Sequence, residues 1–261
     1  KTLPLQKIFK IYNMNKVSII MPSYNAARFI AASIQSVIEQ TYTDWELLIT
    51  DDCSQDNSLI IAKNFADKDP RIQVYSTVRN SGAAIARNVS IKHAQGRYIA
   101  FLDSDDTWEA NKLETQIKFM EDNNIAFSFS NYDIMSEDGT ALGKTIQVPK
   151  VIGYHGYLRN TIIGCLTVII DKEKTGYFEM PNIKSSHDMA LWLLIMKRGF
   201  KAYGLQKTLA NYRLVSTSNT AKKWKAAKDV WKVYREIEHI NPIYSTICFV
   251  GYAINAIIKR L

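Results

Sequence analysis

The chain lacks the cysteine patterns of zinc-binding and disulfide-bonded proteins. Its 261 residues include only three cysteines, Cys53, Cys165 and Cys248, which are far apart and odd in number. No Cys-x-x-Cys or His-Glu-x-x-His pattern occurs, so we expect neither a zinc site nor a disulfide framework. This cysteine usage fits a reducing, cytoplasmic setting.

Targeting segments and long apolar runs are also missing. Polar residues interrupt the apolar stretch at residues 3–11, so no signal peptide is expected. The uncharged, mainly apolar stretch at residues 243–258 is shorter than the roughly 20 apolar residues that cross a bilayer. This stretch either lies on a membrane surface, next to Lys259 and Arg260, or packs on the main domain.

Two common nucleotide-binding motifs are absent as well. The first predicted strand is not followed by Gly-x-Gly-x-x-Gly, and no Gly-x-x-x-x-Gly-Lys-Ser/Thr occurs. Dinucleotide-dependent oxidoreductases and P-loop enzymes are therefore disfavoured.

Charge is distributed unevenly along the chain. Residues 197–261 contain 13 Lys and Arg against three acidic residues, a net charge of +10, whereas the other residues carry a net −2. A basic tail indicates attraction to an anionic membrane, a diphosphate-bearing lipid or nucleic acid. The alternative is a solvated helix face.

The first 130 residues alternate strand-like and helix-like patterns with short connections. The predicted strands are at residues 17–21, 45–50, 71–76, 99–102 and 125–129. The predicted helices are at residues 26–40, 57–66, 82–94 and 108–121, with Asp56 as the N-cap of the second. This alternation is typical of an α/β fold with a mostly parallel central sheet and flanking helices.

Beyond residue 130 the alternation breaks down. Residues 131–157 are rich in turn signals, and we expect them to be mainly loop. The remaining predicted elements are a strand at 165–170, a helix at 188–198, short strands at 201–205 and 210–213, and a long basic helix at 219–239.

Polar side chains directly follow three of the predicted strands. They are Ser23, Tyr24 and Asn25; Asp51 and Asp52; and Asp103, Ser104, Asp105 and Asp106. Adjacent parallel strands place such ends on one rim, where ligands of open α/β sheets bind. An aromatic residue beside an acceptor such as Asp51 suits a nucleobase.

The acidic cluster at residues 103–106 predicts a metal site. Three carboxylates this close together favour a cation between them, and oxygen-only ligation suits Mg²⁺ or Mn²⁺ bound together with substrate phosphates. The alternative is a solvated turn in which Asp106 caps a helix that starts near Trp108.

Four linked motifs resemble those of the family 2 glycosyltransferases of GT-A fold. They are Pro22-Ser23-Tyr24-Asn25, the segment 49–56 with Asp51-Asp52, Asn80-Ser81-Gly82 with Ala86-Arg87-Asn88, and the segment 96–106. The resemblance runs from about residue 16 to about residue 215. It implies an inverting, non-processive enzyme that moves a sugar from a nucleotide diphosphate donor, usually a UDP-sugar, to an acceptor hydroxyl, as in bacterial surface-polysaccharide synthesis.

The resemblance, the position of Met14 just before the first strand and the basic tail together predict a division of the chain. Residues 1–13 are an N-terminal extension, and residues 14–215 are the GT-A catalytic domain. Within that domain, residues 14–130 form the nucleotide-sugar half and residues 131–215 the acceptor half. Residues 216–261 are a basic helical extension and a candidate for membrane-surface contact.

Carried over residue by residue, the resemblance assigns roles to particular side chains. The nucleotide site takes Pro22, Ser23, Tyr24, Asn25, Asp51, Asp52, Asn80, Arg87, Asp103 and Ser104. Asp105 resembles the ligand of Mn²⁺ or Mg²⁺, and Asp188 resembles the catalytic base. Contacts to the acceptor or the diphosphate fall to His187, Trp192, Tyr212 and Arg213.

The chain departs from the family pattern in three places. His187 stands before the base, where the family usually has an acidic residue, and an imidazole can donate a hydrogen bond where a carboxylate only accepts. The Gln-x-x-Arg-Trp signature of processive synthases is missing, which indicates single addition. No His follows Tyr212-Arg213, which leaves water or Arg213 to complete the metal shell.

Charge and resemblance together predict an acceptor saccharide linked to undecaprenyl diphosphate, in O-antigen or capsule-type synthesis. The enzyme would be cytoplasmic and peripheral at the inner face of the membrane, held there by its basic C-terminal segment. No nucleic acid partner is expected.

Two other classes compete with this interpretation. A metal-dependent nucleotidyltransferase would normally have a glycine-rich loop with a lysine after the first strand, and residues 22–28 contain neither residue. A non-catalytic protein would instead bind through the basic C-terminal helix.

Overall fold

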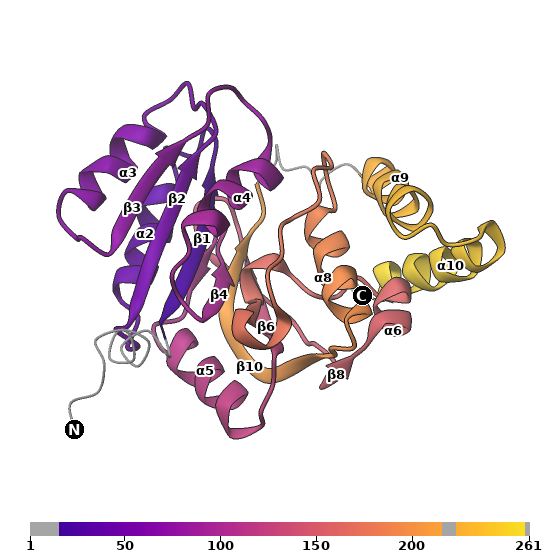
Figure 1. Cartoon of the computed structure of the whole chain (residues 1–261). Coiled ribbons are helices and arrows are strands. Elements are labelled where there is room, and N and C mark those ends of the chain that lie inside the picture. The colour runs from indigo at the N-terminus through magenta and orange to yellow at the C-terminus, as the bar shows by residue number, and fades with distance from the viewer. Residues whose placement is uncertain (1–15, 216–222, 259–261) are drawn as a thin grey trace.

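The computed structural model describes residues 16–215 and 223–258 (Figure 1). The expected extension at residues 1–13 and the expected start of the last basic helix at residue 219 lie outside these described residues.

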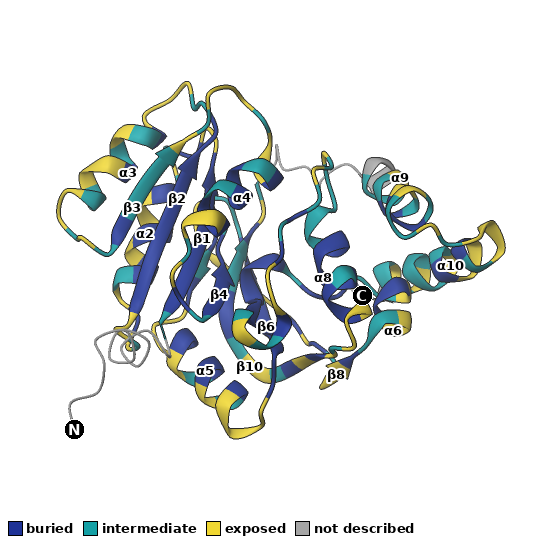
Figure 2. Ribbon diagram, in the orientation of Figure 1, coloured by how far each residue is buried: buried dark blue, intermediate teal, exposed yellow. Residues whose placement is uncertain are grey.

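A ten-stranded mixed sheet lies at the centre of the described chain, with helices on both faces (Figure 2). The main path runs in the order β3 (Ile72–Ser76), β2 (Trp45–Asp51), β1 (Val17–Ser23), β4 (Tyr98–Phe101), β9 (Ile169–Asp171), β6 (Phe127–Met135), β10 (Ala202–Arg213) and β5 (Thr107–Trp108). Beside this path, β7 (Ala141–Ile146) pairs with β6, and β8 (Val151–Ile152) pairs with β10.

Most strands of the sheet point in one direction. β3, β2, β1 and β4 are parallel, and β9 is antiparallel to both of its neighbours, β4 and β6. β6 and the parallel β10 therefore point the same way as β4. The predicted α/β fold with a mostly parallel central sheet is confirmed.

The strand order reverses at β1. The chain moves outward from β1 to β2 and β3 and then crosses back to β4, on the other side of β1. Because such crossovers are right-handed, α2 (Ile30–Ile38) and α3 (Ser58–Ala66) lie on one face, and α4 (Ala83–His93) lies on the other (Figure 1). Ligands of these sheets bind at the reversal point, outside the carboxyl ends of the strands.

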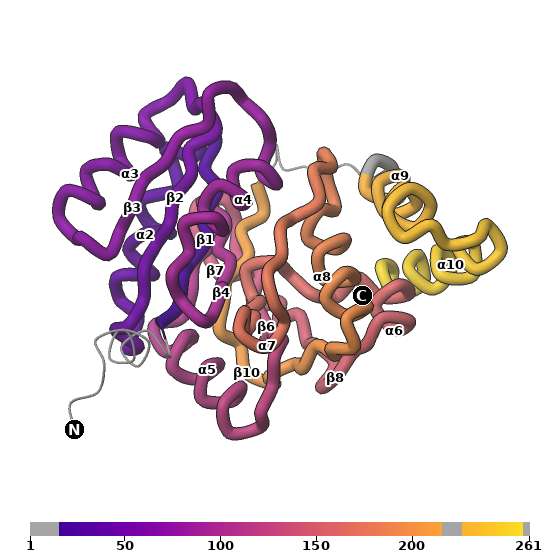
Figure 3. The backbone as a smooth tube through the Cα atoms, viewed as in Figure 1, coloured from indigo at the N-terminus to yellow at the C-terminus, as the bar shows by residue number. Residues whose placement is uncertain are grey.

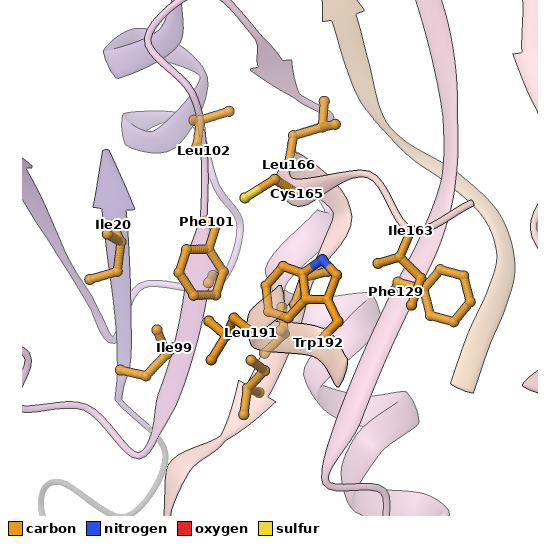
Figure 4. Packing of buried hydrophobic residues seen from close by; sticks show 14 of the residues in the cluster. Ile20, Ile99, Phe101, Leu102, Phe129, Ile163, Cys165, Leu166, Leu191 and Trp192 are labelled. Carbon is orange, nitrogen blue, oxygen red and sulfur yellow. The ribbon is translucent and has the colours of Figure 1, made fainter. Parts of the chain in front are cut away.

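Helix α8 (His187–Lys197) packs on the sheet beside α4. The Asn88 side chain of α4 donates to the Met180 carbonyl at 2.9 Å and accepts from the Met180 amide at 2.8 Å, which ties α4 to the segment leading into α8. Leu191 and Trp192 of α8 lie in the buried core next to Phe101 of β4 (Figure 4). The core therefore positions α8 relative to the end of β4.

The predicted helix at 26–40 begins later, at Ile30, because distant side chains bind the amides that precede it. The Ala26 amide donates to the Ser58 hydroxyl at 2.7 Å, and the Ala27 amide donates to the Asp56 carboxylate at 3.0 Å. The predicted N-cap of α3, Asp56, is one residue too early, because the residue at the helix boundary is Asn57. The Asp56 carboxylate nevertheless accepts from the Ser58 amide at 2.9 Å. The segment after β1 is thus held to the loop after β2.

The predicted helix at 108–121 is also wrong at its start. Thr107 and Trp108 form β5, antiparallel to β10, and α5 (Lys112–Asp122) begins only after it. The Trp108 amide donates to the Ser36 hydroxyl at 3.2 Å, and its indole donates to the Leu166 carbonyl at 2.8 Å. These contacts with distant segments replace the first helical turn.

The region expected to be loop-rich contains a hairpin. β6 continues to Met135 and turns at Glu137-Asp138-Gly139, one of the turns expected from the sequence, into β7. The two predicted strands at 201–205 and 210–213 are one long strand, β10, whose register with β6 shifts twice. The predicted strand at 165–170 is a turn of 3-10 helix, Cys165–Thr167, followed by β9.

The C-terminal region is a pair of helices, where the sequence indicated one long basic helix and an uncharged stretch (Figure 3). α9 (Lys223–Lys232) continues through a π-helical turn, Val233–Ile237, and α10 (Pro242–Ile258) follows. α10 packs on α6 (Tyr154–Arg159), as one of the two alternatives for the uncharged stretch predicted. None of the helices in the described ranges has the length and apolar character needed to cross a bilayer.

Candidate active site

The carboxyl ends of β1, β2 and β4 form one rim of the sheet, as the sequence predicts (Figure 1). Ser23 pairs with Asp51 in parallel register, and the Asp52 amide donates to the Ser23 carbonyl at 2.8 Å. The segment with Asp103 and Asp105 follows β4, on the other side of β1. The three polar segments therefore surround the point at which the strand order reverses.

Tyr24 and Asp51 stand at the end of this rim formed by β1 and β2. The Tyr24 side chain is 51% exposed, so its ring is available for stacking. The Asp51 carboxylate accepts from the Ser54 amide at 3.0 Å and from the Ser54 hydroxyl at 2.5 Å. Asn25 has a left-handed φ of 49° and accepts from the Gln55 amide at 2.8 Å. The loops after β1 and β2 thus form one connected wall.

Pro22 and Ser23 are the last residues of β1 and lie behind that wall. Both are buried. The Ser23 hydroxyl makes no hydrogen bond within the described residues.

Asp52 organises the loop that leads into α4. Its carboxylate accepts from the Thr77 hydroxyl at 2.7 Å, from the Ser81 amide at 2.9 Å and from the Gly82 amide at 2.7 Å. Asn80 belongs to the same loop and donates to the Asp52 carbonyl at 3.3 Å. Asp52 and Asn80 therefore shape the rim through the backbone of this loop.

The acidic segment after β4 contains two buried residues, Ser104 and Asp106, and two half-buried ones, Asp103 and Asp105. Asp106 accepts from the Arg213 backbone amide at 2.8 Å and does not cap a helix, so the alternative of a solvated capping turn is wrong. Burial, and then the charges of Asp105 and Asp103, raise the pKa of Asp106 well above its usual value. Burial and the charge of Asp103 raise the pKa of Asp105 to about 6.

This surplus of negative charge suits a cation. Within residues 16–215 and 223–258, no three His, Cys, Asp or Glu side chains are grouped so that they could hold a metal ion by themselves. A divalent ion at Asp105 would therefore take further oxygens from a bound molecule, as Mg²⁺ does in sites made of one or two carboxylates and substrate phosphates. The residues fit such a shared site.

Arg87 of α4 connects the acidic segment to α8. Its guanidinium is buried and forms an ion pair with the Asp103 carboxylate, and its Nη1 lies 2.5 Å from His187 Nε2. Burial opposes the charge of Arg87, but the carboxylates of Asp103 and Asp188 outweigh it and raise the pKa of Arg87. Burial and the Arg87 charge lower the pKa of His187, so its Nε2 accepts from the guanidinium.

Asp188 lies in the first turn of α8, at the positive end of that helix. Ser186, just before the helix, has a left-handed φ of 59°, which turns the chain into it. The Asp188 carboxylate is half-buried. α8 therefore places Asp188 close enough to Arg87 for its charge to raise the pKa of that guanidinium.

Trp192 does not lie where an acceptor could contact it. Its side chain is fully buried, with ring-centroid distances of 5.3 Å to Phe127 and 5.4 Å to Phe101, which lies next to it in Figure 4. The role that the resemblance assigns to Trp192 is therefore corrected. This residue anchors α8 on the sheet and acts on the site only through the position of that helix.

Arg213 holds the acidic segment in place through hydrogen bonds. Its Nε donates to the Asp105 carbonyl at 2.7 Å, its Nη1 donates to the Glu137 carbonyl at 3.0 Å, and its guanidinium stacks on the Phe29 ring at 5.1 Å. Tyr212 contacts the Tyr132 ring, with 6.2 Å between the ring centroids. The structure thus places the Tyr-Arg pair beside the acidic segment, with most donors of Arg213 bonded to the protein.

One residue of the site was missed by the sequence-based reasoning. Cys165 is buried, and its thiol lies close enough to Arg87, Asp103 and Asp188 for their charges to shift its pKa. Burial is the first cause that raises its pKa well above the usual value, so the thiol is neutral. Nothing in the sequence around Cys165 indicates this position, because β9 and its preceding turn are brought there by antiparallel pairing.

Comparison with known proteins agrees with this geometry. The family model described as glycosyl transferase family 2 matches residues 18–180, which is more than half of the chain. The chain is 51% identical over 245 residues to TuaG of Bacillus subtilis, a glycosyltransferase assigned to teichuronic acid biosynthesis, covering 94% of this chain and 97% of TuaG. It is 42% identical to the Escherichia coli glucosyltransferase WfgD, covering 94% of each chain.

Solved structures share the fold. The mannosyltransferase PcManGT from Pyrobaculum calidifontis, solved with GDP-Man and Mn²⁺, superposes with a TM-score of 0.69. The match covers 94% of this chain and 71% of that one, at 17% sequence identity.

This chain belongs to glycosyltransferase family 2. It is a glycosyltransferase of GT-A fold in bacterial surface-polysaccharide synthesis. Membership of this family decides against the nucleotidyltransferase and the non-catalytic binding protein.

Proposed function

We propose that this enzyme moves one hexose or N-acetylhexosamine from a UDP-sugar, with inversion, to a hydroxyl of a saccharide carried on undecaprenyl diphosphate. The observation that carries the proposal is the pairing of Arg87 with both Asp103 and His187. The buried Arg87 guanidinium thereby connects the donor rim at the end of β4 to the start of α8, where Asp188 lies.

The donor side of the proposal rests on the rim and on a relative. WfgD is named as a glucosyltransferase that uses UDP-Glc. The exposed Tyr24 ring offers a stacking face. The Asp51 carboxylate is buried and accepts from Ser54, and its remaining lone pairs are the proposed acceptors for the imide N–H of uracil. Asp103 is the candidate for the ribose hydroxyls, while Ser104, Pro22 and Asn25 shape the pocket around them.

Asp105 is the proposed metal ligand, with Asp103 beside it. Mn²⁺ or Mg²⁺ bound there would offset the negative charge that builds on the departing UDP. Arg213 keeps the backbone of this segment in place through the Asp105 carbonyl and the Asp106 carboxylate. We expect the surplus carboxylates to favour occupation of this position by a cation.

Asp188 is the proposed general base. Its carboxylate accepts the proton of the acceptor hydroxyl while that oxygen forms a bond to the anomeric carbon. The bond between the anomeric carbon and the diphosphate breaks on the opposite face, through an oxocarbenium-like transition state. His187, held by Arg87, orients the acceptor or the Asp188 backbone from the neighbouring position.

The acceptor is proposed from the relatives and from charge. WfgD is named for an acceptor of GlcNAc-diphosphoundecaprenol, a lipid-linked saccharide. The net charge of +10 over residues 197–261 suits an anionic membrane and the diphosphate of such a lipid. The proposed location is therefore the cytoplasmic face of the cell membrane, with the enzyme bound peripherally.

The proposal is tested by measuring UDP release from a panel of UDP-sugars with a synthetic undecaprenyl-diphosphate-linked saccharide. We expect release with one donor, dependence on added Mn²⁺ or Mg²⁺, loss on chelation, and a product of inverted configuration by NMR. Release of pyrophosphate, or a product that retains the donor configuration, would reject the proposed reaction.

Replacement of the proposed base gives a sharper test. Asp188→Asn should lower kcat by about 10²- to 10⁴-fold, the range typical of a lost general base, while leaving UDP affinity within a few fold. Glu114→Gln is the matched control, because Glu114 also stands in the first turn of a helix and should change turnover little. Asp188→Asn enzyme with near-normal turnover would remove Asp188 from the mechanism.

A further inference from the structure

One face of α10 carries a continuous stripe of exposed aliphatic side chains. Its members recur every three or four residues and therefore lie on one side of the helix: Ile243, Ile247, Val250, Ile254 and Ile257. Each is at least 51% exposed, and Ile243 reaches 77%. Single exposed apolar residues are common, but a contiguous stripe of this kind marks an interaction surface.

The opposite face of α10 is anchored to the protein. Ser245 and Cys248 are fully buried, and the Asn255 side chain donates to the Arg159 carbonyl of α6 at 3.1 Å. The Phe249 ring meets the Trp231 ring of α9 edge-on, with 5.7 Å between the centroids. The helix therefore cannot turn its stripe inward without losing these contacts.

The charge pattern favours a lipid surface as the occupant of the stripe. The sequence of α10 contains no charged residue, whereas the neighbouring α9 exposes Lys228 and Lys232. A helix that pairs with another helix in water usually has charged residues beside its apolar seam, and α10 has none. An uncharged aliphatic face within a basic segment of the chain, here a net +10 over residues 197–261, is typical of helices that lie on anionic membranes.

Aromatic side chains beside the stripe agree with this choice. Phe249 and Tyr252 of α10 and Trp231 of α9 are half-buried and in contact with one another. Aromatic rings are enriched at the membrane–water boundary. With 17 residues, α10 is too short to cross a bilayer but long enough to lie along its surface.

We propose that α10 lies in the plane of an anionic membrane and inserts its aliphatic stripe among the lipid headgroups. The inference rests on the proposed function for its purpose, since a lipid-linked acceptor is reached at that surface. α10 packs on α6, and α6 packs on α8, which begins with His187 and Asp188. The membrane contact is thus connected through two packed helices to the proposed base.

Flotation of the full chain with vesicles tests this surface without any substrate. Vesicles of 30% phosphatidylglycerol and 70% phosphatidylcholine should carry the wild-type protein, and binding should weaken as salt rises. The triple variant Ile247→Ser, Val250→Ser, Ile254→Ser keeps the net charge, and we expect at least about 100-fold weaker partitioning because three half-exposed aliphatic side chains are lost.

The matched control is Ile60→Ser, Leu142→Ser, Val151→Ser, which makes the same kind of change at exposed positions outside α10. This control should float like wild type. Flotation of the α10 variant equal to that of the control would overturn the proposal. A wild-type dimer that fails to float and that the α10 variant converts to a monomer would also overturn it, in favour of a second copy of the chain.

Failure of this inference and failure of the proposed function are distinguishable. UDP release measured with a short, lipid-free acceptor saccharide should be the same for wild type and the α10 variant. Absence of release from wild type under every donor would reject the reaction while the flotation result would stand.

Discussion

Lys112 is a fully buried lysine at the start of α5, and its burial makes a prediction about the pH dependence of stability. Its ammonium donates to Gln116 Oε1 at 2.6 Å and to the Thr167 carbonyl at 3.3 Å, and it lies 5.0 Å from the centre of the Trp108 ring. Burial lowers the pKa of Lys112 to about 7.

The sign of the effect follows from the proton counts of the two states. In the unfolded chain the pKa of Lys112 returns to 10.5. Between pH 7 and 10.5 the unfolded state therefore binds more protons than the folded state, so the free energy of unfolding rises with pH. Below pH 7 both states are protonated, and Lys112 adds no further dependence. From pH 7 to pH 9 the linkage relation gives a gain of about 2 kcal/mol.

The variant Lys112→Met removes the titrating group at similar length. We expect the difference in unfolding free energy between wild type and Lys112→Met to change by about 2 kcal/mol from pH 7 to pH 9, in favour of wild type at the higher pH. Urea denaturation followed by circular dichroism at pH 7, 8 and 9 measures it. Taking the difference cancels the tyrosines and other groups that titrate in both proteins.

Lys118→Met is the control, because Lys118 lies on the same helix with a side chain that is 72% exposed. Its difference from wild type should stay constant over this pH range. A constant difference for Lys112→Met as well would show that Lys112 keeps an ordinary pKa and would refute the reasoning.

Two further predictions concern Trp192, whose expected role was corrected, and Asp52, which organises the loop before α4. Trp192→Phe should cost about 1–3 kcal/mol through the space left in the core and lower Tm by several degrees in calorimetry, with the acceptor KM unchanged because Trp192 is buried. A large rise in that KM without a loss of Tm would restore the role as an acceptor contact. Asp52→Ala should cost about 2–4 kcal/mol in urea denaturation because it leaves the Ser81 and Gly82 amides unpaired. The exposed Asp122→Ala should cost under about 1 kcal/mol, and equal losses for both variants would contradict this account.

The early strands were predictable from the sequence because apolar periodicity is a local property that reports burial. The predicted strand at 45–50 is found at Trp45–Asp51, and the one at 71–76 is found at Ile72–Ser76. The rim of Tyr24, Asp51 and Asp103 was predictable as well, since parallel strands bring their carboxyl ends to one edge however the helices pack.

Element boundaries failed where distant groups compete with local preferences. Side chains from the loop after β2 capture the amides of Ala26 and Ala27, and pairing with β10 takes Trp108 out of the predicted helix. Local patterns contain no information about such partners, which lie 29 or more residues away.

The sequence by itself determined which polar residues follow each strand and the family of the enzyme, because both depend only on the order of residues along the chain. The tertiary structure alone decided that Trp192 faces the core, that Arg213 braces the acidic segment and that the stripe of α10 faces outward. A side chain's direction depends on which elements pack against its own, and that packing is settled only when the whole chain competes for the same buried surface.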